Sequence, residues 1–127
     1  MVLVDTSVWM RFLANRSPYA AELDALLDQE EAAAHDVLYG ELLVADLSSR
    51  GALLQSYRLM HRISDVSHEE VVEFVRANKL HGRGIGWIDA HLLASCLIAT
   101  APLWTADSRL AKLAGELGIS CRPTVQL

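Results

Sequence analysis

The sequence predicts an α/β fold in which helices cover a central parallel sheet. Short apolar runs that suit buried strands, beginning with VLV at residues 2–4, alternate with longer segments of helical period. The chain has 127 residues, of which 52% are hydrophobic, and this suits one domain with a full core. No internal repeat or low-complexity linker divides the sequence, so residues 1–127 are expected to form a single domain.

The first half of the chain contains two expected strands and four expected helices. A brief β-branched run predicts a buried strand at 2–4, and AAAH at 32–35 is a weaker strand. Pro18 suits the first turn of the second helix, and Asp36 is the expected N-cap of the third. The break at Gly51 separates the third helix from the fourth. The helices are expected at about 7–14, 19–29, 36–48 and 51–63.

The second half continues the alternation. Ser67 followed by Glu70 is a capping pattern that begins a helix at 67–80, which ends before Gly82. GWIDAHLLASCLIA predicts a helix at 86–99, apolar on almost all sides and therefore buried. PLWT at 102–105 is an expected strand, a helix at 107–117 ends before Gly118, and ISCR at 119–122 is a last expected strand.

Charge and cysteine content restrict the possible functions. The net charge of −5 argues against nucleic-acid binding by bulk electrostatics, so a polyanion would have to meet a local basic rim or a bound cation. The two cysteines have neither zinc-site nor disulfide-framework spacing and are expected to be packing thiols. No signal peptide opens the chain and no apolar segment reaches about 20 residues, which predicts a soluble, cytoplasmic protein without a membrane span.

Two acids lie just after expected strands. Asp5 comes after the strand at 2–4, and Asp107 comes shortly after the strand at 102–105. Ligands of open parallel sheets bind beyond the carboxyl ends of the strands, where both acids are expected. Each acid alone also fits an ordinary helix N-cap.

Two more acids lie on expected helices. Glu41 shares a helical face with Val37, Leu38, Val44 and Ala45, so it interrupts an apolar stripe, whereas Asp46 projects nearly opposite. A buried salt bridge to Arg109 or Arg11 is an alternative explanation for Glu41. Asp89 lies in the first turn of the helix at 86–99, where the helix dipole alone would favour an acid.

The positions of these four acids are compatible with one pocket. Four carboxylates close together would repel and raise one another's pKa values unless a cation were present. An oxygen-only site suits Mg²⁺ or Mn²⁺ better than zinc. Such an ion can activate water and neutralise charge on a phosphate oxygen, which predicts phosphodiester hydrolysis.

Four segments in this order, VDTSVW, GELLVAD, WIDAHLLASC and LWTADSRL, resemble the acidic motifs of PIN domains, in particular the VapC-type toxin ribonucleases of type II toxin–antitoxin pairs. The resemblance implies a three-layer α/β/α sandwich with a parallel sheet, Mg²⁺- or Mn²⁺-dependent RNA cleavage, a homodimer and a cognate antitoxin. It also implies that the catalytic, metal-binding acids are Asp5, Glu41, Asp89 and Asp107. Thr6, Ser7 and Thr105 would be polar supports near the metal water.

RNA would need cations around an acidic pocket, and Arg11, Arg83 and Arg109 lie close in sequence to the acidic motifs. Each could equally be ordinary solvated charge. The GRGIG stretch follows a helix instead of a strand, so it is interpreted as a helix stop and connection and not as a dinucleotide site. The five histidines lack zinc spacing, and His91 and Ser95 are assigned to core packing because no acid completes a triad in sequence.

Two other functions remain open at this stage. An aspartyl-phosphate phosphatase also begins with a buried strand ending in Asp, but the second Asp expected two residues later is Ser7. A non-catalytic protein-interaction module could retain the same sandwich. The presence of all four acids disfavours this second alternative.

Overall fold

A computed structural model describes residues 1–45 and 51–121. In these residues a three-stranded sheet is accompanied by seven helices. The strands are β1 (Val2–Val4), β2 (Ala32–Ala33) and β3 (Leu103–Trp104). The helices are α1 (Thr6–Leu13), α2 (Tyr19–Asp28), α3 (Asp36–Val44), α4 (Gly51–Leu59), α5 (His68–Ala77), α6 (Trp87–Ala99) and α7 (Ser108–Glu116).

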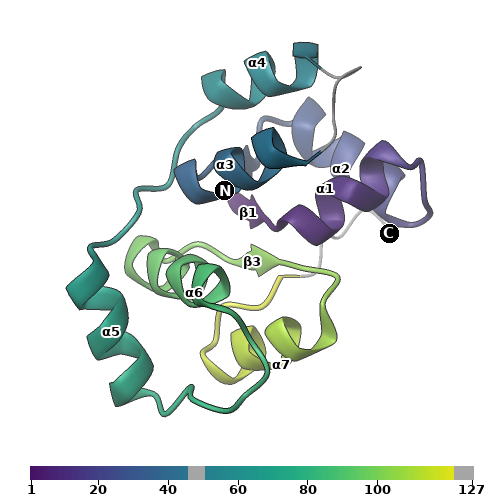
Figure 1. The fold of residues 1–127 in the computed structure, drawn as a ribbon. Helices are drawn as coiled ribbons and strands as arrows, with labels where there is room; N and C mark the ends of the chain where they lie inside the picture. The colour runs from purple at the N-terminus through teal and green to yellow at the C-terminus, as the bar shows by residue number, and fades with distance from the viewer. Residues whose placement is uncertain (46–50, 122–127) are drawn as a thin grey trace.

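The sheet is parallel and has the strand order β2-β1-β3. Leu3 of the central strand β1 pairs with Ala33 on one side and Leu103 on the other. In the view of Figure 1, α2, α3 and α4 lie above β1, α6 lies beside β3, and α5 and α7 lie lower. Since all three strands run the same way, the residues that follow β1 and β3 meet at one edge of the sheet. This confirms the predicted α/β fold with a parallel sheet.

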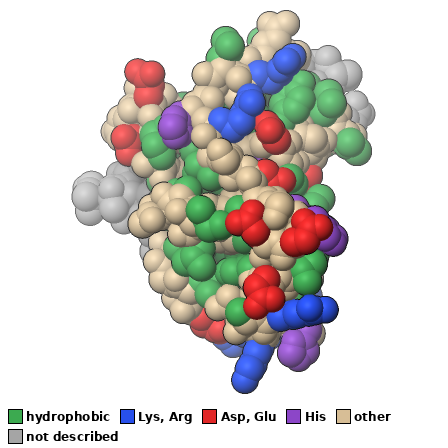
Figure 2. All heavy atoms as spheres, turned by 90° about the vertical axis from the view of Figure 1, so that its left-hand side faces the viewer, with side chains coloured by type: hydrophobic (Ala, Val, Ile, Leu, Met, Phe, Trp, Pro, Cys, Tyr) green, Lys and Arg blue, Asp and Glu red, His purple; other side chains and the backbone are tan. Residues whose placement is uncertain are grey.

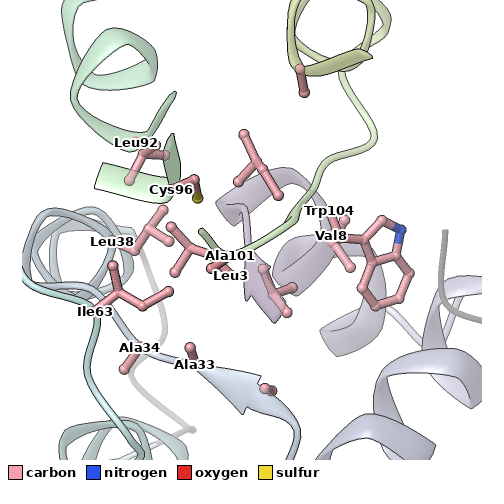
Figure 3. Close-up of a cluster of buried hydrophobic side chains, with 14 of the residues drawn as sticks. Leu3, Val8, Ala33, Ala34, Leu38, Ile63, Leu92, Cys96, Ala101 and Trp104 are labelled. Carbon is pink, nitrogen blue, oxygen red and sulfur yellow. The ribbon is translucent and has the colours of Figure 1, made fainter. Parts of the chain in front are cut away.

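The core surrounds β1. Figure 3 shows Leu3 at its centre, with Leu38 and Leu92 on one side and Val8 and Trp104 on the other. Leu3 is fully buried, as are most of these neighbours. Cys96 is also in this cluster, and burial raises the pKa of its thiol to about 12, so it stays protonated and packs as an apolar group.

The third helix differs from the expected one at its start. Asp36 is not its N-cap, because that position is taken by His35, whose ring Nδ1 accepts a hydrogen bond of 3.0 Å from the backbone N–H of Val37. A histidine can cap in this way only with an unprotonated Nδ1. α3 ends at Val44, and the remainder of the expected segment up to Ser48, including Asp46, falls largely outside the described residues.

Two further expectations about the second half need correction. The expected strand at 119–122 is not a full strand in residues 119–121, which form a single β-bridge between Leu103 and Ser120. Arg122 lies outside the described residues. Helix α6 is not buried on all sides: its core face contains Leu92 and Leu93, whereas four large apolar side chains are substantially exposed, namely Trp87, Ile88, Leu97 and Ile98.

The helix caps of the second half are as predicted. Ser67 accepts from the backbone N–H of Glu70 and the Glu70 carboxylate accepts from that of Ser67, which forms a complete capping box at the start of α5. Gly118 follows α7 with a φ of +76°, a conformation that glycine adopts without strain. In the described part of the chain, no helix is both long and apolar enough to cross a membrane.

Candidate active site

Asp5 lies at the carboxyl end of the central strand, and its side chain does not cap the helix that follows. Its backbone carbonyl accepts from Val8 and Trp9 at the start of α1, but its carboxylate makes no bond to the helix amides. Instead, Asp5 Oδ2 accepts hydrogen bonds from Ser7 Oγ at 2.7 Å and Thr105 Oγ1 at 2.8 Å. The helix-cap interpretation is therefore wrong for the Asp5 side chain, which is 6% exposed.

Backbone amides orient the two hydroxyls that hold Asp5. The N–H of Ala106 donates to Ser7 Oγ at 2.9 Å, and the N–H of Asp107 donates to Thr105 Oγ1 at 3.1 Å. Each hydroxyl has one proton, and accepting from an amide leaves that proton free to point at the carboxylate. The turn after β3 therefore holds Asp5 Oδ2 in place as a hydrogen-bond acceptor.

The Thr6 hydroxyl is a hydrogen-bond donor to the Glu41 carboxylate. Thr6 Oγ1, at the start of α1, donates to Glu41 Oε1 on α3 at a distance of 2.7 Å. Glu41 is half-buried; the core positions of α3 are Leu38 and Leu42, while Val44 is 88% exposed. Of the predicted apolar stripe around Glu41, Leu38 is buried and Ala45 packs against the core, whereas the prediction is wrong for the exposed Val44. Within the described residues neither Arg11 nor Arg109 pairs with Glu41, so the salt-bridge alternative is not supported.

Asp89 lies at the start of α6 close to two of the other acids. Its Oδ2 accepts from the N–H of Gly86 at 2.9 Å, which closes the first turn of the helix. Burial raises the pKa of Asp89 above its ordinary value, the bond from Gly86 lowers it, and the charges of Asp5 and Asp107 raise it further. The charges of Asp5 and Asp107 therefore lie near enough to Asp89 to favour its protonated form.

Asp107 is the exposed member of the set and is an N-cap. Its Oδ1 accepts from the backbone N–H groups of Arg109 at 2.9 Å and Leu110 at 3.2 Å. The helix-cap interpretation therefore holds for Asp107, although the same carboxylate also contributes charge to the region of Asp89.

Among the described residues, the candidate acids do not form a finished metal site. Within residues 1–45 and 51–121, no three His, Cys, Asp or Glu side chains are grouped closely enough to hold a metal ion as they stand. Over the same ranges, none of the four acids forms an ion pair with a Lys or Arg side chain. The four carboxylates are therefore without a neutralising Lys or Arg partner in that part of the chain.

Comparison with known proteins identifies the family. The sequence pattern of the PIN domain matches residues 2–116. The chain belongs to the PIN-domain family. This PIN domain is 37% identical over 121 residues to ribonuclease VapC32 of Mycobacterium tuberculosis, in strain CDC 1551 / Oshkosh and equally in strain ATCC 25618 / H37Rv. The match covers 94% of this chain and 95% of the relative, so the chain is a homologue of a VapC ribonuclease.

The fold is also found in a distant solved structure. The crystal structure of PAE2754 from Pyrobaculum aerophilum superimposes with a TM-score of 0.56 at 17% sequence identity. The superposition covers 92% of this chain and 88% of the other chain. This likeness supports the PIN fold of the present chain.

The three arginines predicted to contact RNA have different surroundings in this PIN domain. Arg83 is bound to Glu116 at 2.7 Å, and Arg11 donates to the backbone carbonyl of Ser7 at 2.9 Å and lies over the Tyr19 ring. Arg109 is exposed and its side chain crosses Gly84, where a Cβ would approach Arg109 Cδ to 2.9 Å. Among these three, Arg109 is the one whose guanidinium has neither an ion pair nor a ring partner in the described residues.

One polar cluster of the PIN domain was missed in the sequence. His91 Nδ1 lies 2.9 Å from Asp65 Oδ1, and His35 Nε2 lies 2.9 Å from Ser95 Oγ. His91 and Ser95 had been assigned to core packing because no acid accompanies them in sequence. Asp65 lies in the segment between α4 and α5. The only sequence signal for this cluster is the His-x-x-x-Ser spacing of His91 and Ser95 on α6.

The coupling of Asp89 to its neighbours predicts a stability effect in metal-free buffer. Because its folded-state pKa is raised, Asp89 contributes stability fully below its ordinary pKa of 3.8 and loses that contribution as the pH rises through the folded value. We expect Asp89→Asn to melt at a higher temperature than the wild type at pH 7 in EDTA. The gain should disappear near pH 3; an equal gain at both pH values would contradict electrostatic repulsion as its cause.

Proposed function

We propose that residues 1–127 act as one nuclease domain, a metal-dependent endoribonuclease that is the toxin of a type II toxin–antitoxin system. The observation that carries the proposal is the Asp5 carboxylate, which is buried at the end of β1 and accepts hydrogen bonds from two oriented hydroxyls. The charge of Asp5 also raises the pKa of Asp89. Homology to ribonuclease VapC32 supports RNA as the substrate class.

The chemistry of the donor set fits a hard divalent cation. Nucleases of the family typically use divalent metal ions, and all four candidate ligands here are carboxylates with no neutralising Lys or Arg partner among the described residues. Asp5, Glu41, Asp89 and Asp107 would hold Mg²⁺ or Mn²⁺. When bound, that ion supplies a Lewis acid for the phosphate and lowers the pKa of a water molecule.

The chain's own residues prepare the site in three ways. Ser7 and Thr105 keep the Asp5 carboxylate in one orientation, and Thr6 does the same for Glu41. Arg109, beside Asp107 and across Gly84, offers a guanidinium to a phosphate of the RNA. Lys and Arg side chains form small separate groups on the face in Figure 2 and do not merge into a basic surface there, which is consistent with RNA binding by local contacts.

The proposed partners follow from the family. A cognate antitoxin would block the nuclease site, and the active toxin would be a homodimer; the protein would act in the cytoplasm. A phosphatase is disfavoured because Ser7, in the position of the second acid of that chemistry, is a hydrogen-bond donor to Asp5.

The direct test is expression in bacteria followed by sequencing of RNA ends. We expect induction of the wild type to arrest growth and to generate new RNA ends, and Asp5→Asn to do neither at the same protein level. Purified wild type should cleave total RNA with Mn²⁺ and stop on addition of EDTA. A wild type that is folded and binds a partner but cleaves no RNA with Mn²⁺ would favour the interaction-module alternative.

The Thr105 hydroxyl gives a second prediction. Thr105→Val removes the donor to Asp5 and leaves the N–H of Asp107 without its acceptor. Hydrogen bonds to charged groups are worth about 1.5–3 kcal/mol, so kcat for RNA cleavage should fall about 10- to 100-fold. Thr105→Ser retains the hydroxyl and is the matched control. Equal rates for Thr105→Val and Thr105→Ser would contradict the supporting role.

A further inference from the structure

His35 is a fully buried histidine that uses both ring nitrogens. Nδ1 accepts from the backbone N–H of Val37 at 3.0 Å and thereby caps α3, and Nε2 lies 2.9 Å from Ser95 Oγ on α6. Its own backbone N–H donates to the Tyr57 hydroxyl of α4 at 3.0 Å. One residue therefore contacts three helices.

These contacts determine the protonation state of the ring. A backbone N–H can only donate, so Nδ1 has no proton. Ser95 Oγ donates its single proton to the backbone carbonyl of His91 at 2.7 Å, so it must accept from His35. Nε2 therefore carries the proton, and His35 is the neutral Nε2–H tautomer.

The electrostatic surroundings agree with a neutral ring. Burial lowers the pKa of His35 below its ordinary value of 6.5, and His91 lowers it further, against the opposing effects of Asp65 and Asp36. Asp65 Oδ1 lies 3.6 Å from Nε2 and 2.9 Å from His91 Nδ1, so this carboxylate is shared between the two rings.

The bond between His35 and Ser95 links the two helices that carry candidate catalytic acids. Glu41 lies six residues after His35 at the start of α3, and Asp89 lies six residues before Ser95 on α6. At 1.5 Å per residue each acid is about 9 Å along its helix from this bond. A shift of one helix relative to the other would therefore be transmitted to the spacing of the two carboxylates.

We propose that neutral His35 is a positioning residue that joins α3 to α6 through Ser95 and so sets Glu41 relative to Asp89. This inference rests on the proposed nuclease function, in which the two carboxylates act together. A displacement of about 1 Å at a catalytic group can cost about 100-fold in rate. Loss of the His35–Ser95 bond is thus expected to lower kcat about 10- to 100-fold and to leave KM within about twofold.

The first experiment does not depend on activity. The ¹⁵N chemical shifts of the imidazole of His35 are measured in metal-free wild-type protein at pH 7.5. We expect an unprotonated Nδ1 and a protonated Nε2. A protonated Nδ1, in either the other neutral tautomer or the imidazolium, would overturn the assignment.

The second experiment separates the cap from the bond between helices. In His35→Asn the side-chain oxygen can cap Val37, as asparagine does at helix N-termini, but the side chain is too short to reach Ser95. In His35→Gln the longer side-chain amide can reach Ser95 but no longer accepts the capping hydrogen bond from Val37. Circular dichroism and urea unfolding establish the temperature at which both variants are folded, and RNA cleavage with Mn²⁺ is measured there. His61→Asn, at an exposed histidine, is the matched control.

We expect His35→Gln to retain a higher kcat than His35→Asn, with similar KM values for both. A more active His35→Asn would assign the effect to the cap and overturn the proposal. The nuclease function and the positioning role of His35 are tested separately. A wild type without any RNA cleavage overturns the nuclease function. An active wild type together with an equally active, folded His35→Asn overturns the positioning role alone.

Discussion

Asp5→Asn should abolish RNA cleavage while leaving the fold intact. The amide can still accept from Ser7 and Thr105 through its oxygen, so the local hydrogen bonds survive. The negative charge that would hold a divalent ion is removed from the centre of the acidic edge. Charge stabilisation by a metal ion is worth several kcal/mol, and a loss of about 4 kcal/mol corresponds to about 10³-fold in kcat.

The measurement is single-turnover cleavage of a labelled RNA at saturating Mn²⁺, with isothermal titration of Mn²⁺ as a second readout. Asp24→Asn replaces an exposed aspartate of α2 in the same way and should match the wild type in both. Asp5→Asn should also melt at or above the wild-type temperature without metal. Cleavage within tenfold of wild type by purified Asp5→Asn would remove Asp5 from the catalytic set.

Leu3→Ala should destabilise the protein more than any surface change of the same kind. Leu3 is fully buried on the central strand, and Figure 3 shows side chains from several elements around it. Truncation of a buried leucine costs about 2.7–5 kcal/mol through lost burial and the cavity that remains. The free energy of unfolding, measured by urea titration, should fall by about 3–4 kcal/mol.

Leu59→Ala is the control for the same substitution on the surface. Leu59 ends α4 and is 87% exposed, so its truncation should change the free energy of unfolding by less than about 0.5 kcal/mol. Similar losses in the two variants would show that Leu3 does not lie at the centre of the cooperative core.

The fold was predictable because its main signals are local. A β-branched run predicted β1 within its observed bounds, and Ser67 with Glu70 predicted the capping box of α5. The exposure of α6 was not predictable, because the composition of a helix does not show how many of its sides have neighbours. Trp87 and Ile98 are apolar but have no element packed fully over them among the described residues.

The candidate acids could be selected from the sequence, but their contacts could not. An acid after a strand and an acid beginning a helix are visible in sequence, but Asp5 and Asp107 look alike there. The structure separates them: Asp107 caps its helix, and Asp5 accepts from Thr105, a residue 100 positions away. The Asp65–His91 contact likewise joins α6 to the segment between α4 and α5, and the His-x-x-x-Ser spacing on α6 does not show which acid lies next to His91.

The hydrogen bonds around Asp5 also set a time order during synthesis. Ser7 and Thr105 are separated by 98 positions, so a ribosome completes most of the polypeptide before the second hydroxyl exists. A truncated translation product would contain Asp5 and Ser7 but would lack Thr105, the Ala106 amide that orients Ser7, and Asp107. Under the proposed nuclease function, catalytic competence would arise only near the end of translation, and interrupted synthesis would leave inactive fragments.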